Sequence, residues 1–134
     1  MFTHETKIRV RYAETDQMGY VYYGNYATYF EVARVDFMKS LGINYKDLED
    51  SGIMMPVLYY STKYYKPALY DNELNVRTIV KELPVTRICF FFEVFNQERI
   101  KLNDAEVTLA FVNVETKKPC PAPQTLINQL KKYF

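Results

Sequence analysis

Near its start the chain alternates between apolar and charged side chains. Ile8, Val10 and Tyr12 alternate with Lys7, Arg9 and Arg11. A period of two residues places one set on each face of a strand, so the pattern predicts a strand over residues 3–12 with one apolar face. Residues 13–20 break the alternation and predict a loop.

After this loop the period changes to three or four residues. Apolar side chains recur at this spacing at Tyr26, Phe30, Ala33, Phe37 and Leu41. The spacing predicts a helix over residues 26–41, which Asn25 is placed to cap and Gly42 to end. Val32 and Val35 add apolar surface on a second side, so we expect this helix to be largely enclosed.

The remaining sequence is mostly typical of strands. A shorter helix is predicted between Asn44, which can cap it, and Gly52, which can end it. Beyond Ile53, segments rich in aromatic and β-branched residues predict four strands, over residues 57–67, 74–83, 87–95 and 105–116. In the last of them we assign Val107, Leu109, Phe111 and Asn113 to one face.

The C-terminal segment predicts one more helix. Pro123 can open it, since proline is favoured in the first turn. Leu126, Ile127 and Leu130 are then expected to face the body of the protein.

Taken in order, the elements are a strand, one long apolar helix and four consecutive strands. This order predicts an α+β hotdog fold, in which an antiparallel sheet of about five strands wraps round one central helix. The 134 residues, 49% of them apolar, give room for a single domain spanning residues 1–134. The edge strand of such a sheet usually pairs with another copy, so we expect a dimer.

Composition narrows the choice of partners. Lys and Arg number 17 against 16 Asp and Glu, which gives no overall attraction to nucleic acid or to an anionic membrane.

Cys89 and Cys120 lie too far apart for a C-x-x-C motif, and two cysteines form no disulfide framework. No apolar window reaches the length of a signal peptide or a membrane span, so a cytoplasmic protein is expected. The 13 tyrosines and 9 phenylalanines exceed the needs of one small core and suggest an aromatic interface or pocket.

Asp16 is the first candidate for chemistry, because it lies in the loop just before the long helix. The free N–H groups at the start of that helix, near Tyr23, Gly24 and Asn25, can polarise a carbonyl oxygen. The carboxylate can act as general base on water or as the nucleophile, and either role is adequate for a thioester. The alternative is that Asp16 only makes an Asx turn before Gly19.

Other catalytic schemes find little support in the sequence. His4 is the only histidine and lies on the first strand, which disfavours Ser-His-Asp, Cys-His and metal-dependent hydrolysis. The four glycines do not form a phosphate-binding loop, and neither a metal nor a cofactor is expected. We expect Glu31 and Arg34 to pair with each other on the helix surface.

Two further groups of residues remain open to more than one interpretation. In the tyrosine-rich strand, Tyr59, Ser61, Lys63 and Tyr65 share one face and Tyr60, Thr62 and Tyr64 the other. This strand can line an acyl pocket or simply pack in the sheet or an interface. Arg77, Lys81 and Arg87 flank the turn at Pro84 and can meet the phosphates of a nucleotide-bearing ligand, or form the solvated edge of the sheet.

The segment "YAETDQMGYVYYGNYATYFEVAR" resembles the signature of the 4-hydroxybenzoyl-CoA thioesterase family. That signature reads D-x-x-G-x-V, then aromatic residues, then N-Y before the central helix. Its positions are occupied by Asp16, Gly19, Val21, Tyr22, Asn25 and Tyr26. The resemblance continues through "YYKPALYDNEL" and "AEVTLAFVNVETKKPCPAP", and so covers nearly the whole chain.

The resemblance implies a hotdog homodimer, often assembled into a homotetramer, that hydrolyses acyl-CoA to the free acid and CoA. By position, Asp16 would be the catalytic carboxylate and the backbone N–H of Tyr23 the donor that polarises the carbonyl. The substrate-binding positions would be Gly19, Val21, Gly24, Asn25 and Ser61, with Lys81 and Arg87 near the nucleotide. Some family members carry histidine where this chain has Tyr23, so a mechanism that needs that imidazole does not transfer.

Two other interpretations of the same fold are kept open. The first is a hotdog protein that binds an acyl-CoA or an acyl carrier protein without turning it over; Asp16 argues against it, because a binder needs no anion beside the carbonyl. The second is a structural partner in a larger complex, suggested only by the tyrosine-rich strands.

Overall fold

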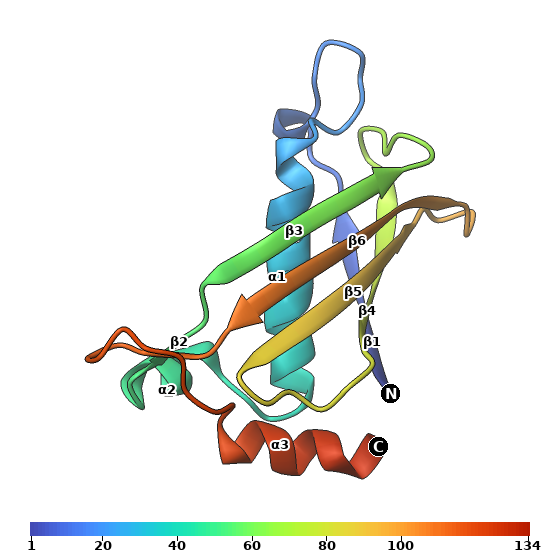
Figure 1. Ribbon diagram of the computed structural model, residues 1–134. Coiled ribbons are helices and arrows are strands. Elements are labelled where there is room, and N and C mark those ends of the chain that lie inside the picture. Colours follow the sequence, from blue (N-terminus) through green and yellow to red (C-terminus); the bar gives the residue numbers. More distant parts are fainter.

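A curved antiparallel sheet wraps round one long helix, as Figure 1 shows for the computed structural model of residues 1–134. The strands lie in the spatial order β1-β4-β5-β6-β3, and all neighbours are antiparallel. Their bounds are β1 (Phe2–Arg9), β3 (Val57–Tyr64), β4 (Glu73–Val80), β5 (Arg87–Phe95) and β6 (Lys101–Ala110). The predicted arrangement of five strands round one helix is confirmed.

The central helix α1 (Gly24–Ser40) buries the predicted face against this sheet. The Phe30 ring stacks on Phe92 at 4.7 Å between centroids, and Phe37 meets Phe90 edge-on at 5.4 Å. The prediction of an enclosed helix is wrong for the single chain, since Val32 is 47% exposed and Val35 is only half-buried. The sheet curls round one side of α1 and leaves the other side open.

The first strand ends earlier than the alternation predicts. It stops at Arg9, and residues Tyr12–Glu14 form a short 3-10 turn, η1, in which the Tyr12 side chain is 78% exposed. The backbone N–H of Arg11 donates to the Glu14 carboxylate at 2.8 Å. This contact turns the chain out of the sheet, although the apolar and charged positions still alternate.

The last strand begins earlier than predicted and is divided in two. β6 starts at Lys101, and the ladder ends at Ala110. Beyond the buried Phe111, β7 (Val112–Asn113) pairs instead with β2 (Ile53–Met54) in a small second sheet. Residues 101–104 are mostly polar and lack strand-forming character of their own, so their place depends on pairing with β5 and β3.

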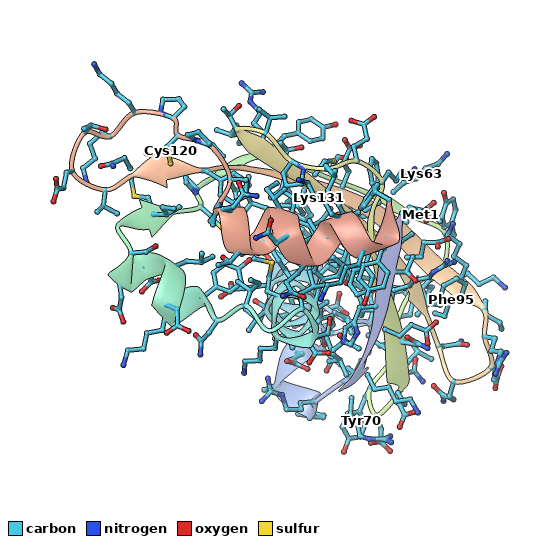
Figure 2. All side chains as sticks on the ribbon, turned by 90° about the horizontal axis from the view of Figure 1, so that it is seen from below. Met1, Lys63, Tyr70, Phe95, Cys120 and Lys131 are labelled. Atoms are coloured by element: carbon cyan, nitrogen blue, oxygen red, sulfur yellow. The ribbon has the colours of Figure 1, made fainter.

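The remaining helices follow the predicted signals. In α2 (Tyr45–Asp50) the Asn44 side chain accepts from the Lys46 N–H, as expected for a cap. α3 (Gln124–Leu130) follows Pro123, buries Leu126 and Leu130, and continues into the 3-10 turn η2 (Lys131–Tyr133). Seen from below in Figure 2, α3 lies across the lower end of α1 and the sheet. None of the helices combines the length and the apolar character that a membrane span requires.

The expected Glu31–Arg34 ion pair does not form. Arg34 Nε instead donates to the hydroxyl of Tyr45 at 3.1 Å, and its guanidinium lies 6.0 Å from the centre of that ring. Arg34 therefore ties α1 to α2, because the nearby aromatic ring offers both an acceptor and a π face.

Candidate active site

A cleft of about 330 Å³ lies beside the start of α1, between the loop that follows η1 and the end of β3. The loop of residues 15–23 pairs with the connection between β3 and β4 through Tyr20 and Leu69. Both segments are at the upper end of the ribbon in Figure 1. The lining residues are Asp16, Met18, Tyr20, Val21, Tyr23, Tyr26, Tyr64, Tyr65, Lys66 and Pro67. The cleft is thus mostly aromatic and apolar, with one acid and one base.

Asp16 is held in place by the loop that it organises. Its Oδ1 accepts from the backbone N–H groups of Met18, at 2.9 Å, and of Tyr20, at 3.2 Å. The turn closes where Gly19, with a φ of +76°, donates its N–H to the Asp16 carbonyl. The Asx turn proposed as the alternative therefore exists, but it occupies only Oδ1. Oδ2 has no hydrogen-bond partner and no ion pair within the chain, so one carboxylate oxygen is available to a ligand.

The first turn of α1 leaves two backbone donors free. The N–H of Asn25 donates to the Tyr22 carbonyl, and the N–H of Tyr26 to that of Tyr23. The N–H groups of Tyr23 and Gly24 have no acceptor in the chain. Free N–H groups at a helix start carry partial positive charge and favour an anion or a polarised carbonyl oxygen.

Glu14 fixes the loop relative to the helix. Its carbonyl accepts from the Tyr22 N–H at 2.9 Å and from the Asn25 side chain at 2.8 Å. The Asn25 amide is therefore a donor inside the first turn, and the expected N-cap role of Asn25 is wrong; α1 begins after Tyr23 without a side-chain cap. The contact connects the chain before the Asp16 loop to the first turn of the helix after it.

The Glu14 carboxylate has its own set of donors. It accepts from the backbone and guanidinium of Arg11 and, at 2.9 Å, from the hydroxyl of Tyr29 in the second turn of α1. Burial by itself would raise the pKa of Glu14, but these hydrogen bonds outweigh it and hold that pKa below its usual value. Glu14 is therefore a buried anion that braces the wall of the cleft.

Two tyrosines form the inner wall. Tyr26 on α1 and Tyr64 on β3 approach to 5.4 Å between ring centroids, and the Tyr26 hydroxyl accepts from the Ala68 N–H at 3.4 Å. Burial raises the pKa of both phenols. Both hydroxyls thus keep their protons at neutral pH and can donate to a ligand.

The residues expected at the site from the sequence fall into two groups. Asp16, Val21 and Tyr23 line the cleft, and Gly19 shapes the Asp16 turn. Gly24 packs so closely on Tyr22 that an added Cβ would lie 2.9 Å from that ring. Asn25 supports the loop through its contact with the Glu14 carbonyl.

Ser61, Lys81 and Arg87 lie elsewhere in the chain. Ser61 is on the outer face of the sheet, opposite Glu106. Lys81 and Arg87 line a separate depression with Cys89 beside the β4–β5 turn, which Figure 1 shows at the opposite end of the sheet. Within one chain these three residues do not meet Asp16.

His4 is remote from the cleft as well. Its Nε2 lies 2.8 Å from Asp36 Oδ2 on α1, and the Thr6 hydroxyl donates to the same oxygen at 2.6 Å. His4 therefore joins β1 to α1, and it does not accompany Asp16.

Three residues that serve the cleft were not expected from the sequence. Glu14 and Tyr29 form the brace, and Lys66 is the only basic side chain in the lining. Arg11 and Glu14 have the spacing of a helical ion pair, but Arg11 lies at the end of the predicted strand and Glu14 in the predicted loop. Lys66 lies at the end of a tyrosine run that resembles ordinary strand, so only its position in space distinguishes it.

Comparison with known proteins shows which family this chain resembles. Residues 10–130 match the model of the family described as the thioesterase-like superfamily. Among curated proteins, a putative acyl-CoA thioesterase, YneP, from Bacillus subtilis is 31% identical over 98% of this chain and 100% of its own. The acyl-CoA thioester hydrolase YbgC from Escherichia coli is 28% identical over 93% of each chain.

Solved structures agree with these matches. A DHNA-CoA thioesterase from Staphylococcus aureus superposes with a TM-score of 0.86 at 36% identity, over 100% of this chain and 85% of its own. The predicted hotdog fold and the predicted kinship with the 4-hydroxybenzoyl-CoA thioesterases are consistent with these findings and are confirmed at the level of the superfamily.

Proposed function

The chain belongs to the thioesterase-like superfamily and is a thioester hydrolase, and from this premise we propose that it cleaves acyl-CoA at the cleft beside the start of α1. The observation that carries the proposal is that Asp16, whose Oδ2 has no partner in the chain, and Tyr23, whose backbone N–H has no acceptor, line the same cleft. The products would be the free acid and CoA, and the reaction needs no cofactor.

The roles of the groups follow from their chemistry. The unpaired N–H groups of Tyr23 and Gly24 would bind the thioester carbonyl oxygen and stabilise the negative charge that forms on it during attack. Asp16 would either take a proton from the attacking water or attack the carbonyl carbon itself. In the second case CoA leaves as the acyl group passes to Asp16, and a water molecule then hydrolyses the resulting mixed anhydride to release the acid and restore the carboxylate. CoA leaves as a thiolate, which is stable enough to depart without a strong general acid. The absence of an imidazole from the cleft is therefore compatible with the reaction.

Asp16→Asn tests this proposal with little disturbance of the loop. The amide oxygen of asparagine can still accept from Met18 and Tyr20, so the turn is kept and only the anion is lost. We expect hydrolysis of a panel of acyl-CoAs, followed with a thiol reagent, to slow on the order of 100-fold or more. Asp47→Asn, on the exposed surface of α2, is the matched control and should retain full activity.

Asp16→Ala separates the turn from the chemistry. It removes the acceptor as well as the anion, and should lower thermal stability in addition to activity. Unchanged turnover in Asp16→Asn would refute the catalytic role of this carboxylate. Binding of acyl-CoA by calorimetry without thiol release over hours would instead favour the non-catalytic binding protein.

We further propose that the working unit is a homodimer. β3 is an edge strand, and its first six residues, Val57–Thr62, carry no charge. The opposite edge, β1, is protected by Glu5, Lys7 and Arg9. An uncharged, aromatic edge favours pairing with a second copy, and it would place a partner next to the cleft wall at Tyr64. The mass of the protein in solution, measured by sedimentation, distinguishes a dimer from a tetramer.

A further inference from the structure

Asn103 is the most unusual buried residue outside the loop of the candidate site. Its side chain on β6 is fully buried, and neither its Oδ1 nor its Nδ2 has a hydrogen-bond partner. A polar group buried without a hydrogen-bond partner destabilises the folded state, and such groups are few in native proteins. The position therefore calls for a partner that the chain itself does not supply.

The register of the sheet places Asn103 directly behind the cleft. Asn103 on β6 is opposite Tyr64 on β3, so the two side chains are on the same face of the sheet. Tyr64 is a wall of the cleft and touches Tyr26 of α1. Asn103 thus lies on β6, the strand next to the edge strand β3 that carries Tyr64.

A second unpartnered group lies beside it. The Thr62 hydroxyl is buried without a hydrogen-bond partner, and Thr62 pairs with the small Ala105 in the next row of the same face. Thr62 is the diagonal neighbour of Asn103, at a distance that one ligand group can bridge. Tyr60, one row further along β3, packs on Phe30 of α1. The row of Thr62 and Ala105 therefore lies between the rows of Tyr60 and Tyr64.

We propose that Asn103 and Thr62 form the polar end of the acyl-binding cleft and bind a hydroxyl group carried by the acyl part of the substrate. The inference rests on the proposed thioesterase function and assigns these two residues as specificity determinants. A hydroxyl both donates and accepts, and so does each of the two side chains. The surrounding residues Tyr60, Ala105 and Val107 otherwise favour an apolar acyl group.

Tyr64 lies between this polar end and the cleft. Its ring is half-exposed and lies on an edge strand, which is held by hydrogen bonds on one side only. A rotation of the ring away from Tyr26 would open the way from the cleft to Asn103. The acyl group would then enter behind Tyr64 while its thioester stays at Asp16.

The test compares matched substrates that differ by one hydroxyl. Butyryl-CoA is paired with 3-hydroxybutyryl-CoA, and benzoyl-CoA with 4-hydroxybenzoyl-CoA, and kcat/KM is measured for each. We expect the protein to favour the hydroxylated member of at least one pair by about tenfold or more, because the analogue without the hydroxyl leaves buried groups unpaired. Asn103→Leu and Thr62→Val should each reduce that preference about tenfold, mainly by slowing the hydroxylated substrate.

Thr78→Val is the matched control. The Thr78 hydroxyl is likewise buried without a partner and faces the same side of the sheet, but it lies on β4, three strands from β3. This variant should keep the preference of the unmodified protein. If Asn103→Leu does not fold, Thr62→Val, which preserves shape, still decides the question.

Failure of the polar end and failure of the proposed function give different results. If all acyl-CoAs are hydrolysed and the folded variants keep the same ratio, Asn103 and Thr62 are not specificity determinants. A buried water as the partner would produce this result together with a lower melting temperature for Asn103→Leu. If the unmodified protein turns over no acyl-CoA at all, the proposed function itself fails.

Discussion

At the scale of single residues, two carboxylates only two positions apart do different work because their surroundings differ. Asp16 gives one oxygen to a turn and keeps the other free in a cleft. Glu14 is almost enclosed and has its oxygens taken by Arg11 and Tyr29. The first arrangement is suited to chemistry, whereas the second is suited to holding the first in position.

Glu14→Gln is expected to destabilise the protein. The amide keeps the size of the side chain but loses the charge that Arg11 and the Tyr29 hydroxyl bind, and hydrogen bonds to a charged group are the stronger kind. We expect a loss of about 2 kcal/mol at pH 7, measured by urea unfolding. Glu98→Gln, on an exposed turn, should change stability by less than about 0.5 kcal/mol and serves as the control.

The lowered pKa of Glu14 also predicts that the stability of the fold depends on pH. Because the folded-state pKa of Glu14 lies below its ordinary value of 4.5, its contribution is complete above that value and disappears as the pH falls through the lower, folded-state pKa. Unfolding curves measured from pH 7 down to pH 3 should show the unmodified protein losing more stability than Glu14→Gln. Parallel curves for the two proteins would contradict this assignment.

The sequence signature singles out Asp16, which lines the cleft, but it gives the wrong role to Asn25. A short polar residue before an apolar periodic run has the signature of a cap, yet Asn25 lies inside the helix and donates to Glu14. The acceptor, the Glu14 carbonyl, is eleven residues away in the sequence, so no local pattern predicts this hydrogen bond. Asn103 is a similar case, since its burial depends on strands that pair from both sides.

At the scale of the elements, the link between β1 and α1 depends on one acid. Asp36 of α1 accepts from the Thr6 hydroxyl and from His4, both on the inner face of β1. The Thr6 hydrogen bond is the main cause of a lowered pKa at Asp36, which outweighs burial, and His4 adds to it. β1 is an edge strand, so this contact supplements the single row of hydrogen bonds that it makes with β4.

Asp36→Asn should loosen this edge of the sheet. The side chain is about half exposed, so we expect a loss of only about 1 kcal/mol in global stability. The more sensitive measurement is amide hydrogen exchange, which should become faster in β1 and remain unchanged in β5 at the centre of the sheet. Asp50→Asn, on the exposed surface of α2, is the control; equal exchange in β1 of both variants would contradict the role of Asp36.

Elements were predictable where periodicity and burial agree. α1 and β5 have a single dominant pattern, and their predicted and observed bounds differ by no more than two residues. β1 and β6 differ more, because a ladder ends where its partner strand turns away and not where alternation stops. The open side of α1 around Val32 was unpredictable for the same reason: apolar residues show what can be buried, but not which elements reach them.

At the scale of the whole molecule, the two edges of the sheet are chemically different. β1 presents charged residues, whereas β3 begins with Val57, Leu58, Tyr59 and Tyr60, all at least 40% exposed. Exposed apolar surface of this kind marks an interaction site in a protein that must otherwise avoid aggregation. The cleft lies at the end of the same strand, so assembly and activity are expected to depend on one another.

Tyr59→Lys combined with Ser61→Lys should separate the copies without unfolding the chain. The new lysine at position 61 would face Glu106 on β6 and the one at position 59 would face Thr108, so the protomer keeps its own pairing. Antiparallel contact between two β3 strands, by contrast, would bring like charges together. Sedimentation should show a dimer for the unmodified protein and at least about tenfold weaker association for the variant, equivalent to about 1.4 kcal/mol.

Thr3→Lys on β1 is the control and should remain dimeric. If the double variant is monomeric but retains full kcat/KM, the partner contributes nothing to the cleft, and a monomeric unmodified protein would rule out the β3 interface altogether.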